Sequence, residues 1–393
     1  DIYGGILCLQ MVNQGWSSAI AATVYVWTNS PINGPGTGWT NAFHNIQSGI
    51  NAATNIGDVV IVTNGVYNVG GEIGSQSYVT SRVALTIPIT VRSANGPTFT
   101  TIVGAPYQSY IKSRDAVRCA YLTNGAMLSG FTLSNGWTWS SYESFGREGG
   151  GVYAFSNAVI TNCIIIDCHS GNQGGGVYSG RVYNSKISGC NPHGIYGATV
   201  HNSLIESNLQ GAGSCILSNC IVRRNGSDNP DTTLNGVGVS RGKAYNCEIS
   251  DNTTVKGDGA GASDAMLYNC IIGGNSTRWG IGGGVYRGRV EHCTVTRNSA
   301  WWCGGVYDAA TWNSIVYWNT PSNIYLSMSS LVDSGYNCTT EHMADRGGSI
   351  YTDPRLISES HLSANSPCIG AGYSNSNAGV DIDGQAWLVP PCI

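Results

Sequence analysis

The segments NCEISDN (246–252) and NCIIGGN (269–275) decide the fold, because they are two copies of one unit that recurs along the chain. The pattern is Asn, then Cys or Ser, then an apolar residue at the fourth position and Asn or Cys at the seventh. Further copies are NCIIIDC (162–168), NSKISGC (184–190), NSLIESN (202–208), NCIVRRN (219–225), HCTVTRN (292–298) and NSIVYWN (313–319). Asn337-Cys338 begins a degenerate copy, and the mean period is about 22 residues.

The residues within each unit alternate with the period of a β-strand. Cys or Ser at the second position and Ile or Val at the fourth fall on one face, while another apolar residue stands two positions before the first Asn. This change of parity predicts a bend at the first Asn, and a second bend is expected at the seventh position. A third short strand begins at GGGVY (149–153, 174–178, 282–286) or CGGVY (303–307). Three short strands and three turns per repeat predict one coil of a parallel β-helix.

The asparagines and cysteines of the unit have clear places in such a coil. Asn tolerates strained turn geometry, and identical side chains can bond from one coil to the next. Cysteines share the inward second position, which predicts either a column of buried thiols or disulfides between coils. These cysteines are Cys163, Cys220, Cys247, Cys270 and Cys293. Cys168 and Cys190 replace the seventh-position Asn in adjacent coils and form the best disulfide candidate, while Cys368 and Cys392 are candidates to staple the tail.

The composition excludes several classes of protein. The chain has 393 residues, a net charge of −4 and only 11% charged residues, whereas proteins that bind nucleic acid carry basic stripes. Aromatic residues make up 9%, which argues against disorder. No run of 18 apolar residues is present, so the sequence predicts no membrane-spanning helix.

The ends of the chain differ from the repeats. Residues 1–22 are predicted to be an N-terminal extension that pairs as an edge strand with this chain or a neighbouring one. Residues 23–345 are predicted to form the β-helix, with a helix near 40–53 that caps its open end. Phe43, Ile46, Gln47 and Ile50 have the helical spacing that such a cap needs. Residues 346–393 are predicted to form a C-terminal tail.

Both ends also resemble a known superfamily. WTNAFHNIQSGINAA (39–53) and GDVVIVTNGVY (57–67) are similar to the entry of secreted bacterial β-helix proteins of the pectate-lyase-like superfamily. DPRL (353–356), SPCIGAG (366–372) and DIDG (381–384) are similar to the C-terminal segment of many such members. The resemblance implies an all-β, single-stranded right-handed parallel β-helix and an extracellular or cell-surface location. It does not imply one activity, because this fold carries lyases, hydrolases, adhesins and structural proteins.

A cluster of charged residues is the best candidate for a catalytic site. It lies where the repeat lengthens to 27 residues, between 219 and 246, and long loops on rigid scaffolds often carry function. The candidates are Asp228, Asp231, Asp258, Asp264, Arg241 and Lys243. A polysaccharide lyase would use such carboxylates on Ca²⁺ with an Arg or Lys base, and a hydrolase would use paired acids. The alternative is a solvated loop, in which case neither Ca²⁺ nor another cofactor is expected.

Four sequons are candidate N-glycosylation sites, at Asn225, Asn252, Asn275 and Asn337. Chance matches are expected in a sequence so rich in Asn.

Three functions remain open at this stage. The preferred hypothesis is an extracellular structural or adhesive protein that self-associates, because charge is low and no complete catalytic motif is present. The alternatives are a lyase or hydrolase that acts on a uronate-type polysaccharide through the 223–264 cluster, and non-catalytic carbohydrate binding. Exposed aromatic residues can stack on sugars or contact other proteins, so they fit all three.

Overall fold

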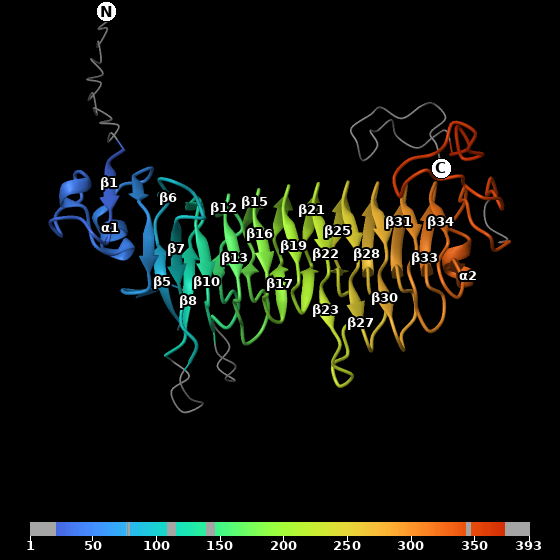
Figure 1. The fold of residues 1–393 in the computed structure, drawn as a ribbon, viewed down its shortest axis with the longest axis horizontal. Helices are drawn as coiled ribbons and strands as arrows, with labels where there is room; N and C mark the ends of the chain where they lie inside the picture. The colour runs from blue at the N-terminus through green and yellow to red at the C-terminus, as the bar shows by residue number, and fades with distance from the viewer. Residues whose placement is uncertain are drawn as a thin grey trace, which may run out of the picture.

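The computed structural model describes residues 21–75, 77, 79–107, 115–138, 146–342 and 347–373. These residues form a right-handed parallel β-helix, as the sequence predicts, and its coils stack into a rod (Figure 1). The predicted N-terminal extension, residues 1–22, lies outside the described residues except for its last two. Cys392 also lies outside them. Within the described part, no helix has the length and apolar character needed to cross a membrane.

Each coil contributes strands to three places, which we call column A, column B and the second sheet. Column A contains β5 (Thr80–Leu85), β8 (Val117–Leu122), β11 (Val152–Ala154), β14 (Val177–Tyr178), β17 (His193–Tyr196), β20 (Gln210–Gly213), β24 (Val239–Ser240), the first parts of β28 (Ala262–Tyr268), β31 (Val285–Glu291) and β33 (Val306–Trp312), and β35 (Ile324–Tyr325). The short β4 (Glu72–Ile73) pairs antiparallel with β5.

Column B follows column A within each coil and belongs to the same large sheet. It contains β1 (Thr23–Val26), β2 (Val59–Val62), β6 (Thr90–Ser93), β9 (Met127–Ser129), β12 (Val159–Thr161), β15 (Arg181–Tyr183), β18 (Thr199–His201), β21 (Ile216–Ser218), β25 (Lys243–Tyr245) and the last parts of β28, β31 and β33.

The second sheet has eleven parallel strands and holds the Ile and Val residues of the repeat unit. It contains β3 (Gly65–Tyr67), β7 (Thr100–Val103), β10 (Thr132–Ser134), β13 (Ile164–Ile166), β16 (Lys186–Ser188), β19 (Leu204–Glu206), β22 (Ile221–Arg223), β26 (Glu248–Ser250), β29 (Ile271–Gly273), β32 (Thr294–Thr296) and β34 (Ile315–Tyr317). A small third sheet contains β23 (Gly226–Ser227), β27 (Thr253–Thr254) and β30 (Ser276–Thr277).

One helix covers the first coils, where the sequence predicts a cap. It is α1 (Ile46–Ala52), preceded by the 3-10 turn η1 (Trp39–Asn41), and Asn45 caps it by accepting from the backbone of Ser48. Ile46 and Ile50 are buried against the core, and a Cβ at Gly49 would meet a methyl group of Val26 at 2.5 Å. The helix therefore shields apolar residues that an open end of the rod would expose. A second short helix, α2 (Met328–Leu331), lies near the last coils (Figure 1).

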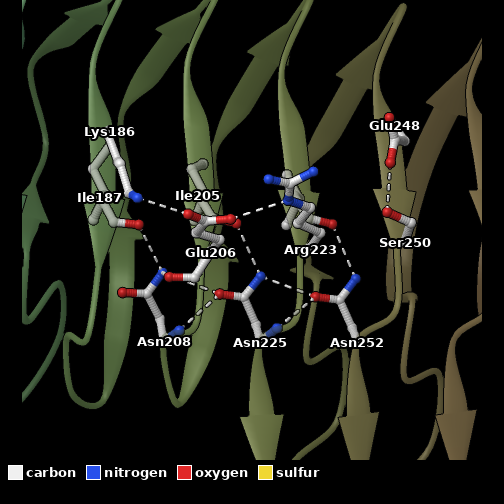
Figure 2. Close-up of polar contacts among 11 residues, drawn as sticks. Lys186, Ile187, Ile205, Glu206, Asn208, Arg223, Asn225, Glu248, Ser250 and Asn252 are labelled. Carbon is white, nitrogen blue, oxygen red and sulfur yellow. Dashed lines mark hydrogen bonds and ion pairs between the residues drawn. The ribbon is translucent and has the colours of Figure 1, made fainter.

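The two asparagines of the unit have different roles. The first has a positive φ and makes the bend between column B and the second sheet, as at Asn246 (53°) and Asn269 (51°). The seventh is buried and forms a ladder along the rod (Figure 2). We call the seventh-position residues, together with Asn323 in the following coil, the asparagine ladder: Asn208, Asn225, Asn252, Asn275, Asn298, Asn319 and Asn323.

Every inner member of the asparagine ladder uses both ends of its amide. The Asn252 Oδ1 accepts from the backbone N–H of Asn225 at 3.0 Å and from its Nδ2 at 2.9 Å. The Asn252 Nδ2 donates to the Val222 carbonyl at 3.0 Å and to the Asn275 Oδ1 at 2.9 Å. Buried amides satisfied in this way fix the register of successive coils.

This packing overturns the glycosylation prediction. Asn225, Asn252, Asn275 and Asn337 are at most 1% exposed. The Nδ2 atom that would carry a glycan instead donates to a carbonyl of the preceding coil, as at Asn337, which donates to Thr311 at 2.7 Å. A sugar on any of these nitrogens is incompatible with the folded chain, so the prediction is wrong.

The cysteines of the repeat form columns of buried free thiols, which is one of the two alternatives that the sequence left open. Burial raises the pKa of Cys163 to about 11 and that of Cys215 to about 12. Cys168 and Cys190 are also free thiols in this structure, as Cys338 and Cys368 are, and the disulfide between Cys168 and Cys190 stays a prediction. The Cys190 N–H bonds to the Asn208 Oδ1 at 3.0 Å, so the two cysteines extend the asparagine ladder.

Candidate functional site

Column A carries a ladder of tyrosines on its outer face, because the Tyr that ends GGGVY, and its counterpart in most other coils, points away from the interior. Stacked pairs join Tyr121 to Tyr153 (5.6 Å between ring centroids), Tyr153 to Tyr178 (5.3 Å) and Tyr178 to Tyr196 (6.3 Å). The stack resumes with Tyr286, Tyr307 and Tyr325, at 5.7 and 5.0 Å. We call these residues the tyrosine ladder.

The tyrosine ladder is interrupted in three successive coils. Strand register places Gly213, Ser240 and Ser263 where the other coils have Tyr. Tyr196 and Tyr286 are therefore four coil steps apart, about 19 Å at the usual spacing of parallel strands. We call this interruption the tyrosine gap.

A pocket of about 340 Å³ occupies the tyrosine gap. Ser240 and Ser263 are among the residues that line it. Its other walls come from the first residues of β17 and β20, from a residue before β24, and from the bend after column A. These are His193, Gln210, Asn235, Arg241 and Asp264. A Cβ on Gly213 would lie 2.6 Å from the Tyr196 ring and 3.1 Å from the His193 ring. Glycine at this position therefore lets both rings lie close to the backbone of β20.

Arg241 and Asp264 reach the pocket from a turn that recurs along the rod, with positive φ also at Ser214, Arg287 and Asp308. Both have positive φ, 53° and 50°, at the bend between columns A and B. The Arg241 N–H donates to the Ser263 carbonyl at 2.9 Å, which stacks the two turns directly. The Ser263 hydroxyl donates to the Asp264 Oδ2 at 3.1 Å. A guanidinium and a carboxylate on successive coils thus stand beside the same pocket.

His193 is the titratable group most altered by the site. Its ring lies edge-to-face against Tyr196, 5.2 Å between centroids, and its Nδ1 has no hydrogen-bond partner among the described residues. Burial, with a smaller effect from the Arg241 charge, lowers the pKa of His193 to about 4. The imidazole is therefore neutral at pH 7, and its buried Nδ1 makes no hydrogen bond within the described residues.

The structure brings together only two of the six predicted catalytic residues. Arg241 and Asp264 line the pocket. Lys243 is exposed on column B, beyond the turn, and is not part of the lining. His193, Gln210 and Asn235 were not predicted.

The other three carboxylates lie elsewhere. Asp228 and Asp231 are exposed in the loop after β23, which protrudes from the rod (Figure 1). The Asp258 Oδ1 accepts from the backbone N–H of Ile281 at 3.0 Å and so holds the turn of the next coil. The predicted cluster is therefore not one site. Within the described residues, no three carboxylate, imidazole or thiol groups are placed to hold a metal, so the residues present do not fit Ca²⁺.

A second group of charges lies on the outer face of the second sheet. Glu206 is 2.8 Å from Lys186 and 3.0 Å from Arg223 (Figure 2). These two partners lower the pKa of Glu206, with Lys186 the larger cause. Both carboxylate oxygens are engaged by neighbouring coils, so this group joins three strands and offers no open pocket.

Comparison with known proteins gives matches among solved structures alone. A pectate lyase is 17% identical, with 94% of this chain and 96% of that chain covered and a TM-score of 0.48. A rhamnogalacturonan lyase is 11% identical, with coverage of 86% and 91% and a TM-score of 0.43. The A-module of a mannuronan C-5 epimerase from Azotobacter vinelandii is 12% identical, with coverage of 79% and 96% and a TM-score of 0.41. No protein-family model matches, and no curated protein is similar.

The coiled parallel strands themselves confirm the β-helix fold that the resemblance at both ends of the sequence implied. At this level of similarity the activities of those proteins do not transfer to this chain.

Proposed function

We propose that the protein binds a polysaccharide along the outer face of column A, with the tyrosine gap as the central site. The observation that carries this proposal is the gap itself. A pocket with polar walls interrupts a row of stacked aromatic rings, and aromatic rings lie beyond it in both directions. Sugar rings combine apolar faces, which stack on aromatic side chains, with hydroxyl groups that both donate and accept hydrogen bonds.

The residues of the pocket match both requirements. Asp264 accepts hydrogen bonds, Arg241 donates them, and the neutral imidazole of His193 can do either. Towards the C-terminal end, Tyr307 and Tyr325 are joined by Trp302, whose centroid is 5.4 Å from that of Tyr325. Trp302 and Tyr325 are 50% and 42% exposed, so the aromatic surface continues beyond the gap.

The test closes the tyrosine gap without disturbing the fold. Ser240→Tyr places the residue that most other coils have at this position, while Ser240→Ala keeps the gap open and serves as the control. Affinity electrophoresis and calorimetry with polygalacturonate, alginate and a neutral galactan would measure binding. We expect Ser240→Tyr to weaken binding at least about tenfold, which corresponds to roughly 1.4 kcal/mol, and the control to bind like the wild type. Unchanged binding in both Ser240→Tyr and Ser263→Tyr would overturn the proposal.

A second candidate function, a lyase activity at the same pocket, is favoured by the unpaired Nδ1 of His193. Neutral His193 would take the proton from the carbon next to a uronate carboxylate, while Arg241 balances the carboxylate charge. The electrons of the C–H bond would then form a double bond while the bond from the neighbouring carbon to the glycosidic oxygen breaks. The proton held by His193 would pass to that oxygen, which leaves as a hydroxyl group. Ultraviolet absorbance of the unsaturated product, measured with and without Ca²⁺, tests this step. Wild type and His193→Ala giving the same zero rate would leave binding as the function.

The hypotheses of self-association and of an extracellular location stay predictions. Sedimentation of the full chain over a range of concentrations and electron microscopy at near-physiological salt would test the first. Regular filaments would support it, and isolated rods would contradict it.

A further inference from the structure

The tail of the chain packs on the last coils through a small core of its own. Residues 347–373 lie against the outer face of β34, away from the main interior. Only three buried residues, Ile315, Cys338 and Cys368, make up this second core among the described residues, with partly buried neighbours around them. The same segment reaches Arg297 on the preceding coil through Glu359.

The position of Cys338 departs from the repeat by one residue. In other coils the second residue of the unit faces inward, and its partner in the next coil accepts from its backbone N–H, as between Cys293 and the Ser314 hydroxyl at 3.1 Å. The Ser314 N–H donates instead to the Asn337 Oδ1 at 3.2 Å, so Asn337 occupies the inward place. Cys338 pairs with Ile315, on the outer face of the sheet. This shift removes Cys338 from the buried thiol column and turns it towards the tail.

Cys368 is the residue of the tail that meets it. Cys338 and Cys368 are both 0% exposed and belong to the same core, although 30 positions separate them. Each of the two cysteines is the largest influence on the other's thiol, which lowers the pKa of Cys368 and raises that of Cys338. The Cys338 thiol donates to the Thr352 carbonyl at 3.3 Å. Isolated bridges and single hydrogen bonds hold the rest of the segment, such as Tyr373 N–H to the Asn313 Oδ1 at 2.8 Å.

Cys338 and Cys368 are both free thiols in this structure, as the repeat cysteines are. We propose that oxidation joins them in a disulfide that fastens the tail to the last coil. Cys368 is thus paired with Cys338, in place of the partner Cys392 that the sequence suggests. A covalent link has a clear structural purpose here, because the segment it closes has little regular structure and a core of three buried residues. The repeat cysteines have no such need, since backbone ladders already join their coils.

The oxidant is an external disulfide of the glutathione type, which acts before the tail docks. The Cys368 thiolate attacks one sulfur of that disulfide, forms a mixed disulfide and releases one thiolate. Docking of the tail then brings the Cys338 thiolate to the Cys368 sulfur, and the second external thiolate leaves. The two protons of the cysteine thiols end on the two released thiols, so one external disulfide is reduced as one protein disulfide forms.

Peptide mapping of the full chain tests the pairing. The protein is refolded in a mixture of oxidised and reduced glutathione, denatured, alkylated at its free thiols and digested. We expect a cross-linked pair of peptides that contain Cys338 and Cys368, while Cys168 and Cys190 carry the alkyl label as internal controls. Alkylation of both Cys338 and Cys368, or a link from Cys368 to Cys392, would overturn the proposal.

Limited proteolysis tests the consequence for the tail. Reduction of the wild type is expected to speed cleavage between residues 355 and 365 at least about tenfold, because cleavage follows the population of the undocked tail. Cys338→Ser should be cleaved at one rate with and without reductant, whereas the matched variant Cys163→Ser should respond like the wild type. Equal cleavage of the wild type in both conditions would contradict a disulfide at this position.

Discussion

The asparagine ladder and the tyrosine ladder run along the same rod but tolerate interruption very differently. The asparagine ladder is buried and continues from Asn208 to Asn323, and every inner amide is bonded to the coils on both sides. The tyrosine ladder is partly exposed, apart from the buried Tyr121, and is broken at three coils. A missing amide would leave buried partners unsatisfied, whereas a missing ring leaves a solvated hollow. An interruption of the outer ladder is therefore compatible with the fold and creates a place for a ligand.

The largest effect is expected from breaking the inner ladder. Asn252→Ala removes one hydrogen bond each from the Val222 carbonyl, the Asn275 Oδ1, and the backbone N–H and Nδ2 of Asn225. We expect the free energy of unfolding to fall by about 3–5 kcal/mol, measured by urea denaturation. The neighbouring exposed residue provides the control, since Thr253→Ala should change it by less than about 0.5 kcal/mol. A loss as small as that for Asn252→Ala would refute the structural role of the ladder.

A pH-dependent effect is expected at the edge of the tyrosine gap. His193 takes up a proton near pH 6.5 in the unfolded chain but only near pH 4 in the folded one, because burial lowers its pKa. Protonation thus favours unfolding, and the folded state loses stability as the pH falls from about 6.5 to 4. His193→Gln should remove on the order of 3 kcal/mol of this loss at pH 4 and little at pH 7. Identical pH profiles for variant and wild type would show that the imidazole is more hydrated than its position indicates.

A smaller effect is expected where the outer ladder is continuous. Tyr178 stacks between Tyr153 and Tyr196, so Tyr178→Ala removes two aromatic contacts. The free energy of unfolding should fall by about 1–2 kcal/mol, well below the loss for Asn252→Ala. Tyr286 stacks on Tyr307 but faces the gap on its other side, so Tyr286→Ala should cost less than Tyr178→Ala. The reverse order in thermal or urea denaturation would contradict the proposed ladder energetics.

The smallest effect on stability is expected from closing the gap. Ser240→Tyr adds a ring on the outer face, at a position where most coils already have one, and should change the free energy of unfolding by less than about 1 kcal/mol. Combined with a loss of polysaccharide binding, this result would separate function from folding at one residue. A strongly destabilised variant would mean that the serine side chains are part of the packing.

The sequence predicts the fold well because the repeat itself is the structural unit. The period, the bend at the first Asn, the inward Cys and Ile, and the helix near Ile46 and Ile50 all follow from local pattern. The sequon prediction failed because a three-residue motif gives no information about burial, which depends on the coils above and below. The register shift at Asn337 is likewise visible only when the neighbouring coil is in place.

The candidate site was largely missed for a similar reason. The 219–246 spacing correctly indicates an enlarged coil, but carboxylates that are near in sequence point to different sides of a solenoid. The position that indicates the site is the last residue of GGGVY. It is Ser in the corresponding segments GVGVS (236–240) and GAGAS (259–263). When the coils are compared with one another, the missing tyrosines mark the pocket. The positions of the charged residues along the sequence do not.

The tyrosine gap also determines how substitutions can change the length of this surface during evolution. Since the pocket consists of whole rings left out of a regular array, its length can grow or shrink only in steps of one coil, about 4.8 Å. One exchange between Tyr and Ser at the end of a column A strand lengthens or shortens the groove by one step and leaves the interior untouched. The length of the gap can thus be matched to polysaccharides of different repeat length through the number of coils that lack Tyr, with no change to the core.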